Sequence, residues 1–118
     1  MRVTTDIWVH VFLRRETARG AFTTVINKGA TEAGTIFIVE DPLTSNFNLY
    51  GPAPQSLLSQ GDDDRKFEPV LDNVSEKEVD DYLARQKNFD PDIWVIETQC
   101  RQGPPSIDLA VEEKSEIF

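Results

Sequence analysis

The chain has 118 residues, of which 39% are hydrophobic and 28% are charged, and its formal net charge is −9 at pH 7. This composition is typical of one folded domain and excludes a disordered or collagen-like chain. The acidic balance disfavours DNA binding, because binding to phosphates depends on Lys and Arg, and the longest apolar runs are far too short to cross a membrane.

The first predicted element is a helix that begins at Asp6, a suitable N-cap, and ends at Gly20, a suitable C-terminal capping residue. Trp8 and Phe12 lie four residues apart and would share one helical face. Alternate residues over 7–13 are also apolar, so a strand that leads into a short helix remains the alternative. We favour the helix.

Three strands are predicted next. Residues 21–28 alternate in polarity and are rich in β-branched side chains, and residues 35–40 form a nearly continuous apolar run. The segment 29–34 between them contains two glycines, which indicates an antiparallel hairpin. A turn over 41–46 leads to a short third strand over 47–50. Three consecutive strands with short turns predict a meander whose apolar face needs a cover.

A long polar connection over residues 51–64 follows, and a connection of this length in so small a domain is either mobile or functional. Ser75 and Glu78 then have the spacing of a capping box, which predicts the start of a second helix. Asp90-Pro91 ends this helix, because the residue before Pro avoids the α region. The run 93–96 is apolar on both faces and predicts a buried central strand.

These elements predict a single α+β domain over residues 1–100. We expect a small, mostly antiparallel sheet of about four strands with two helices packed on one face. Residues 101–118 begin as a Gly-Pro-Pro linker and continue as an acidic segment, so we expect a flexible or partner-docked tail. Cys100 cannot form an internal disulfide, and the first residues lack the pattern of a signal peptide, so we expect a cytoplasmic protein.

Several spaced segments of the chain carry a resemblance to a known family. They are Thr5-Asp6-Ile7-Trp8-Val9, Arg14-Arg15, Lys28-Gly29, Ala33-Gly34, Leu49-Tyr50-Gly51-Pro52-Ala53-Pro54-Gln55 and Phe89-Asp90-Pro91-Asp92-Ile93-Trp94-Val95. Together they resemble, over residues 3–97, a family of small bacterial proteins known as domain of unknown function 1491. The resemblance implies a bacterial, cytoplasmic protein of about this length, and it assigns no catalytic or binding residue.

The first helix carries three arginines, Arg14, Arg15 and Arg19, which could bind a phosphate, a carboxylate or an RNA backbone. The alternative is that they form a solvated helix face or pair with acidic groups of the chain itself, and the net charge favours this second interpretation. Tyr50 and Trp8 are candidates for the wall of a binding groove, although aromatic residues are more often part of the core.

The run of three acids Asp62, Asp63 and Asp64 is the candidate metal site, because Mg²⁺ and Ca²⁺ prefer carboxylate oxygens. It lacks the spacing of a calcium-binding loop, so a solvated acidic turn is the more common interpretation and a weak divalent cation the alternative. His10 and Cys100 are the only His and Cys, which excludes an ordinary structural zinc site. We expect no cofactor.

The sequence therefore favours a non-enzymatic interaction or small binding module, acting on a protein partner or as a homodimer. Charge is segregated along the chain, with a net +1 over residues 1–40 and a net −6 over residues 61–92, which is suited to contacts between surfaces. The alternative is a metal-assisted or carboxylate-based enzyme that uses Asp62, Asp63 or Asp64. A second alternative is anion or RNA binding by the arginines of the first helix.

Overall fold

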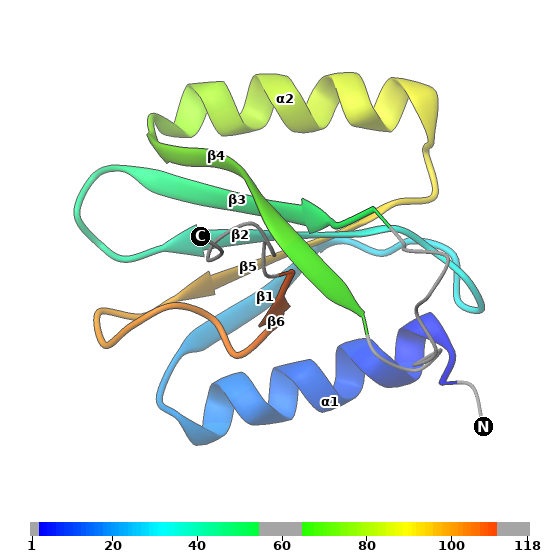
Figure 1. The fold of residues 1–118 in the computed structure, drawn as a ribbon, viewed down its shortest axis with the longest axis horizontal. Coiled ribbons are helices and arrows are strands. Elements are labelled where there is room, and N and C mark those ends of the chain that lie inside the picture. The colour runs from blue at the N-terminus through cyan, green and yellow to red at the C-terminus, as the bar shows by residue number, and fades with distance from the viewer. Residues whose placement is uncertain (1–2, 55–64, 111–118) are drawn as a thin grey trace, which may run out of the picture.

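The computed structural model describes residues 3–54 and 65–110, which form one compact α+β domain (Figure 1). The described part of the chain has two helices and six strands. In chain order they are α1 (Thr5–Ala18), β1 (Phe22–Asn27), β2 (Ile36–Asp41), β3 (Phe47–Pro52), β4 (Lys66–Val74), α2 (Glu76–Phe89), β5 (Trp94–Gln99) and β6 (Asp108–Leu109). Neither helix has the length and apolar character needed to cross a membrane.

The strands form one mixed sheet in the order β1-β5-β2-β3-β4-β6. Strands β2, β3 and β4 make an antiparallel meander, whereas β5 runs parallel to β2 and antiparallel to β1. The short β6 adds to β4 in parallel. The prediction of about four mostly antiparallel strands is therefore wrong in number, and two of the strand pairs run parallel.

The expected hairpin between the first two strands does not form, because β5 lies between them. The connection from β1 to β2 passes against the start of β5. A Cβ on Gly29 would overlap the backbone oxygen of Asp92, and the amide of Ala30 donates to that oxygen at 3.0 Å. Trp94 of β5 adds a second hydrogen bond between β5 and the β1–β2 connection, because its indole nitrogen donates to the Ala30 oxygen at 2.8 Å. The central position predicted for the 93–96 run is confirmed.

The two helices pack on opposite faces of the sheet, so the prediction that both cover one face is wrong (Figure 1). The core on the α1 side contains Val9, Phe12, Ile36, Ile38, Phe67, Trp94 and Ile96. The core on the α2 side contains Phe37, Val39, Leu49, Val79, Ile93 and Val95. The physical reason is that β2 is buried along its whole length and β5 along most of it, and strands apolar on both faces need a cover on each.

The helix ends follow local rules. The predicted capping box at Ser75 is confirmed: the Ser75 Oγ accepts from the amide of Glu78, and the Glu78 carboxylate accepts from the amide of Ser75. The helical interpretation of the first segment is also confirmed, although the N-cap is Thr4 and not Asp6. The Thr4 hydroxyl donates to the Asp6 carboxylate at 2.7 Å.

Two segments outside the expected elements also belong to the sheet. Strand β4 crosses the sheet at an angle, with Phe67 in the core on the α1 side and Val70 and Leu71 against the core on the α2 side (Figure 1). After β5 the chain turns back, so that Pro105 is buried and Ile107 packs against the α1-side core. Residues 101–110, assigned by sequence to the start of the acidic tail, thus contact the sheet, and residues 111–118 lie outside the described residues.

Candidate functional site

One part of the sheet surface has no helix over it. Helix α2 lies over β3 and β4, and Val95 of β5 is buried in the core beneath it, which leaves β1 and the Glu97–Gln99 end of β5 more open on the same face (Figure 1). The register of these two strands places Phe22 beside Gln99 and Thr24 beside Glu97 on this face. Phe22 is 68% exposed and Ile26 is 56% exposed, high values for large apolar side chains. We call this surface the β1–β5 face.

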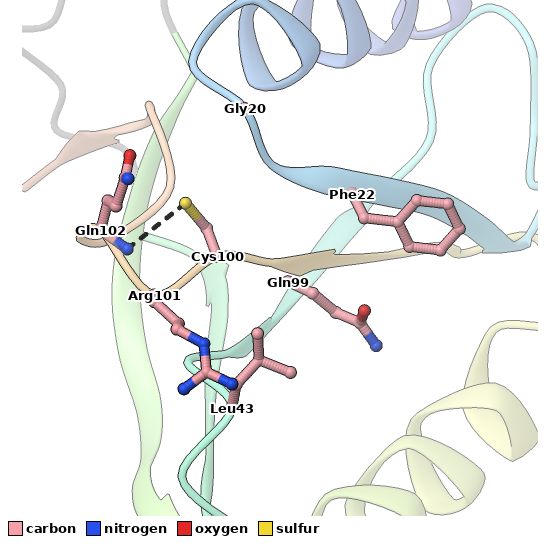
Figure 2. A pocket seen from close by; sticks show the side chains of 7 residues that line it. All are labelled: Gly20, Phe22, Leu43, Gln99, Cys100, Arg101 and Gln102. Atoms are coloured by element: carbon pink, nitrogen blue, oxygen red, sulfur yellow. Dashed lines mark hydrogen bonds between the residues drawn. The ribbon is translucent and has the colours of Figure 1, made fainter.

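A depression of about 360 Å³ lies at one end of the β1–β5 face. Its lining consists of Gly20, Phe22, Leu43, Gln99, Cys100, Arg101 and Gln102. Figure 2 shows Phe22 and Gln99 extending in the same direction from neighbouring strands, while Arg101 reaches toward Leu43. The side chain of Leu43 is exposed to solvent. Its backbone has a φ of 66°, a left-handed conformation that costs a non-glycine residue about 1 kcal/mol. The rim of the depression thus presents apolar groups to solvent.

The middle of the β1–β5 face is acidic. Partial burial is the largest effect and raises the pKa of Glu97, the hydrogen bond from Gln99 at 3.4 Å acts to lower it, and the carboxylates of Asp41, Glu76 and Asp80 each raise it by a smaller amount. Within the described ranges, no Lys or Arg side chain pairs with Glu97. A cation placed over this carboxylate would relieve the repulsion.

These carboxylates do not form a metal centre. Among residues 3–54 and 65–110, no group of three or more His, Cys, Asp or Glu side chains is arranged to hold a metal ion. The predicted metal ligands Asp62, Asp63 and Asp64 lie outside the described residues.

A second polar cluster lies on the opposite face, around a carboxylate that is itself fully buried. The carboxylate of Glu16 has no exposed surface and accepts five hydrogen bonds. Two come from the Arg19 guanidinium at 2.9 Å, one from the Thr98 hydroxyl at 2.6 Å, and two from the amide and hydroxyl of Ser106 at 2.9 and 2.7 Å. Burial acts to raise the pKa of Glu16, but these donors together outweigh it and hold the pKa at about 2.

This cluster accounts for two of the three arginines. Arg19 is held in the bidentate pair with Glu16, and its Nη1 also donates to the Gly103 oxygen at 3.4 Å. Arg15 is exposed and donates to the backbone oxygen of Ser106 at 3.1 Å. Arg14 is exposed on α1. The hydrogen bonds of Arg15 and Arg19 therefore go to groups of the chain itself, in α1 and in the segment after β5.

The other predicted site residues lie apart from the β1–β5 face. Trp8 is half-buried and stacks on Phe12, with ring centroids 5.3 Å apart. Tyr50 donates from its hydroxyl to the Glu40 carboxylate at 2.8 Å, and burial together with this bond raises the pKa of Tyr50. Both side chains belong to the α1 side of the sheet.

His10 and Cys100 are not neighbours. The His10 ring contacts the backbone oxygen of Asp6 in the first half of α1. Cys100 follows β5, and its sulfur accepts from Arg19 near the other end of the helix at 3.5 Å. Sequence reasoning missed Glu97 because it lies next to the apolar run 93–96, and only the arrangement of neighbouring strands shows how acidic its surroundings are.

Comparison with known proteins places the chain in a family. A family model described as "Protein of unknown function (DUF1491)" matches residues 3–108, which extends beyond residue 97, where the resemblance in the sequence ended. No curated protein matches.

Solved structures with the same fold include protein Atu0922 from A. tumefaciens, determined in solution, with 35% identity and a TM-score of 0.82 over 98% of this chain and 100% of that one. A crystal structure of a DUF1491 family protein from Caulobacter crescentus CB15 has 30% identity and a TM-score of 0.76 over 94% of this chain and 100% of that one. An NMR structure of a DUF1491 family protein from the same organism has 32% identity and a TM-score of 0.73, with 94% and 99% coverage. The chain therefore belongs to the bacterial DUF1491 family of proteins of unknown function.

Proposed function

We propose that this protein is a non-enzymatic interaction module of the bacterial cytoplasm, which binds a partner protein through the β1–β5 face. The observation that carries the proposal is the exposure of Phe22 and Ile26 on the strand next to Glu97, a carboxylate that forms no ion pair with any Lys or Arg among residues 3–54 and 65–110. Exposed apolar groups gathered on one face are typical of interaction surfaces. Covering a side chain such as Phe22 stabilises a complex by about 2 kcal/mol.

The chemistry of the face selects the kind of partner. An apolar segment that also carries Lys or Arg would cover Phe22 and Ile26 and would place a positive charge near Glu97. The carboxylates of Asp41, Glu76 and Asp80 add to the attraction, as does the net charge of −9. An acidic partner would meet repulsion from the same groups, so charge also provides specificity.

The two alternatives have weaker support. Anion or RNA binding by the arginines of α1 competes with the contacts that Arg19 and Arg15 make to Glu16 and Ser106. The enzymatic alternative depends on Asp62, Asp63 and Asp64, which lie outside the described residues. We therefore retain protein binding as the proposed function.

Photo-crosslinking tests the proposal. The photoreactive amino acid p-benzoylphenylalanine is placed at position 22, and a matched variant carries it at position 11. Val11 is an exposed apolar residue on the outer side of α1 and serves as the control. After irradiation in the native bacterium, we expect an adduct of defined mass from position 22 that is absent from position 11. The charge reversal Glu97→Lys, combined with the label at position 22, should remove this adduct.

The cross-linked residues of the partner decide the outcome. Peptides that contain Lys or Arg among apolar residues support the proposal. An adduct that is unchanged by Glu97→Lys, or identical adducts from positions 22 and 11, contradict it. An adduct only with a second copy of this chain identifies self-association and also contradicts binding of a separate partner.

A further inference from the structure

Strand β1 is the outermost strand at one end of the sheet. It pairs with β5 on one side only. Apart from that ladder, the backbone groups of residues 22–27 make no hydrogen bond to the rest of the described chain. Every residue of β1 is exposed or half-buried, whereas β2 is buried throughout. The free edge of β1 therefore offers its N–H and C=O groups to another extended chain.

We infer that the partner adds one extended strand along the free edge of β1, and that this strand has the pattern apolar–x–Lys/Arg–x–apolar. The inference rests on the proposed function and specifies how the partner is recognised. In strand addition, backbone hydrogen bonds provide affinity, and the alternating side chains on one face provide specificity. Here the side chains that specify the partner are those of the β1–β5 face.

The register of the sheet fixes which partner residue meets which group. Thr24 and Glu97 are in one row across the sheet, and Phe22 and Gln99 are in another. A residue added next to Thr24 extends the row of Glu97, about 10 Å away at two strand spacings. Because Thr24 is short, a Lys or Arg at that point can extend over it to the Glu97 carboxylate. The partner residue two positions away on one side meets Phe22, which requires an apolar group. On the other side, the partner segment ends beside the exposed Ile26, where the β-bulge interrupts the regular register.

The end of the ladder is also defined. The pairing of β1 with β5 is regular over 22–25 and then has a β-bulge between Val25 and Asn27. A bulge on an edge strand stops regular pairing, and proteins use such bulges against uncontrolled aggregation. The edge of β1 can therefore pair with one short segment, whereas the bulge prevents regular pairing with a longer strand.

A second copy of this chain is a poor occupant of the same edge. Antiparallel pairing of two β1 strands would bring two Glu97 carboxylates onto adjoining parts of one face. Strand β1 itself, FTTVIN, has no Lys or Arg to place beside them. Charge therefore favours a basic segment of another protein over self-association.

Titration of the isotopically labelled full chain with synthetic nine-residue peptides tests this inference. One peptide has Arg at the centre and Val two positions away on each side. A second has Glu in place of the Arg. Two further peptides keep the Arg sequence but carry N-methyl groups on alternate backbone nitrogens, one peptide at the odd positions and the other at the even positions. Chemical shifts report where each peptide binds, and amide hydrogen exchange reports whether the β1 backbone becomes paired.

We expect the Arg peptide to give saturable shifts over residues 22–27 and to slow exchange of alternate β1 amides at least tenfold. The Glu peptide should bind at least tenfold more weakly, and one N-methylated phase should lose binding. The variant Glu97→Gln should reduce the preference for Arg while the slowed exchange remains. The double variant Phe22→Ser with Ile26→Ser should lose binding. The control variant Val11→Ser should retain it.

The contrary outcomes separate this inference from the proposed function. Two results overturn strand addition but leave binding to the β1–β5 face intact. One is a set of chemical-shift changes on that face without slower amide exchange in β1. The other is equal binding by the Arg peptide and both of its N-methylated forms. Cross-links from position 22, with no change in chemical shifts or amide exchange when the peptides are added, also overturn strand addition and leave the proposed function standing. The loss of both the cross-links and the peptide effects overturns the proposed function itself. Sedimentation as a dimer, with β1 amides already protected, assigns the edge to a second copy and overturns the inference.

Discussion

Replacement of Glu16 by Gln removes the charge from the buried carboxylate that joins α1, β5 and the segment after Cys100. The pKa of Glu16 is about 2 in the folded protein, against an ordinary value of 4.5. The difference corresponds to about 3 kcal/mol of folding free energy, at about 1.4 kcal/mol for each pH unit. A fully buried acceptor of five hydrogen bonds, two of them from a guanidinium, is consistent with this magnitude.

The sign of the pH dependence follows from the lowered pKa. A carboxylate with a lower pKa in the folded state stabilises the fold fully above its unfolded value, and this stabilisation is lost as the pH falls through the folded value. The contribution of Glu16 is therefore complete at pH 7, about 1.4 kcal/mol at pH 3, and small at pH 2. The Gln variant has no charge to lose at this position.

Urea unfolding at pH 7 and pH 3, followed by tryptophan fluorescence, measures this effect. We expect Glu16→Gln to lower the free energy of unfolding by about 3 kcal/mol at pH 7 and by roughly half as much at pH 3. The matched control Glu32→Gln changes an exposed carboxylate and should be nearly neutral at both pH values. A difference that is equal at the two pH values, or below 1 kcal/mol at pH 7, would refute the reasoning.

Three further predictions concern other features of the fold. Ser75→Ala removes the hydroxyl that caps α2 and should lower stability by about 1 kcal/mol in urea unfolding, whereas an unchanged midpoint would contradict the role of the cap. Gly29→Ala places a Cβ on the backbone oxygen of Asp92 and should cost at least about 3 kcal/mol, so a protein of native stability would show that the two connections do not pack closely. Tyr50 should ionise well above pH 10 in an ultraviolet titration because its burial and its hydrogen bond to Glu40 raise its pKa, and ionisation at pH 10 would show that the bond is absent.

Local patterns predicted the elements better than their arrangement. The capping box at Ser75 and the Pro after Asp90 marked both ends of α2, because these signals act through neighbouring backbone groups. The alternation over 21–28 also predicted β1 correctly. It did not indicate that the face with Phe22 and Ile26 would be exposed, because exposure depends on where α2 packs.

The candidate site shows the same limit. The apolar members of the β1–β5 face were visible in the sequence as one side of a predicted strand. The acidic surroundings of Glu97 could not be predicted from the sequence, because Asp41 is brought beside it from β2 and Glu76 from α2. Arg19 is a mixed case: its partner Glu16 lies three residues earlier on the same helix and is a local contact, whereas Gly103 is brought to it only by the fold.

The sequence by itself determined the class of the domain, the positions of both helices and the central place of β5, because periodicity, capping and a doubly apolar run act within a few residues. Only the tertiary structure decided that β5 separates β1 from β2, that the helices pack on opposite faces, and that β1 keeps a free edge next to the strand that carries Glu97. These features depend on pairings between residues far apart in the chain, such as Phe22 with Gln99 and Ile36 with Trp94. Such pairings are selected by burial of the whole sheet and leave no short-range pattern in the sequence.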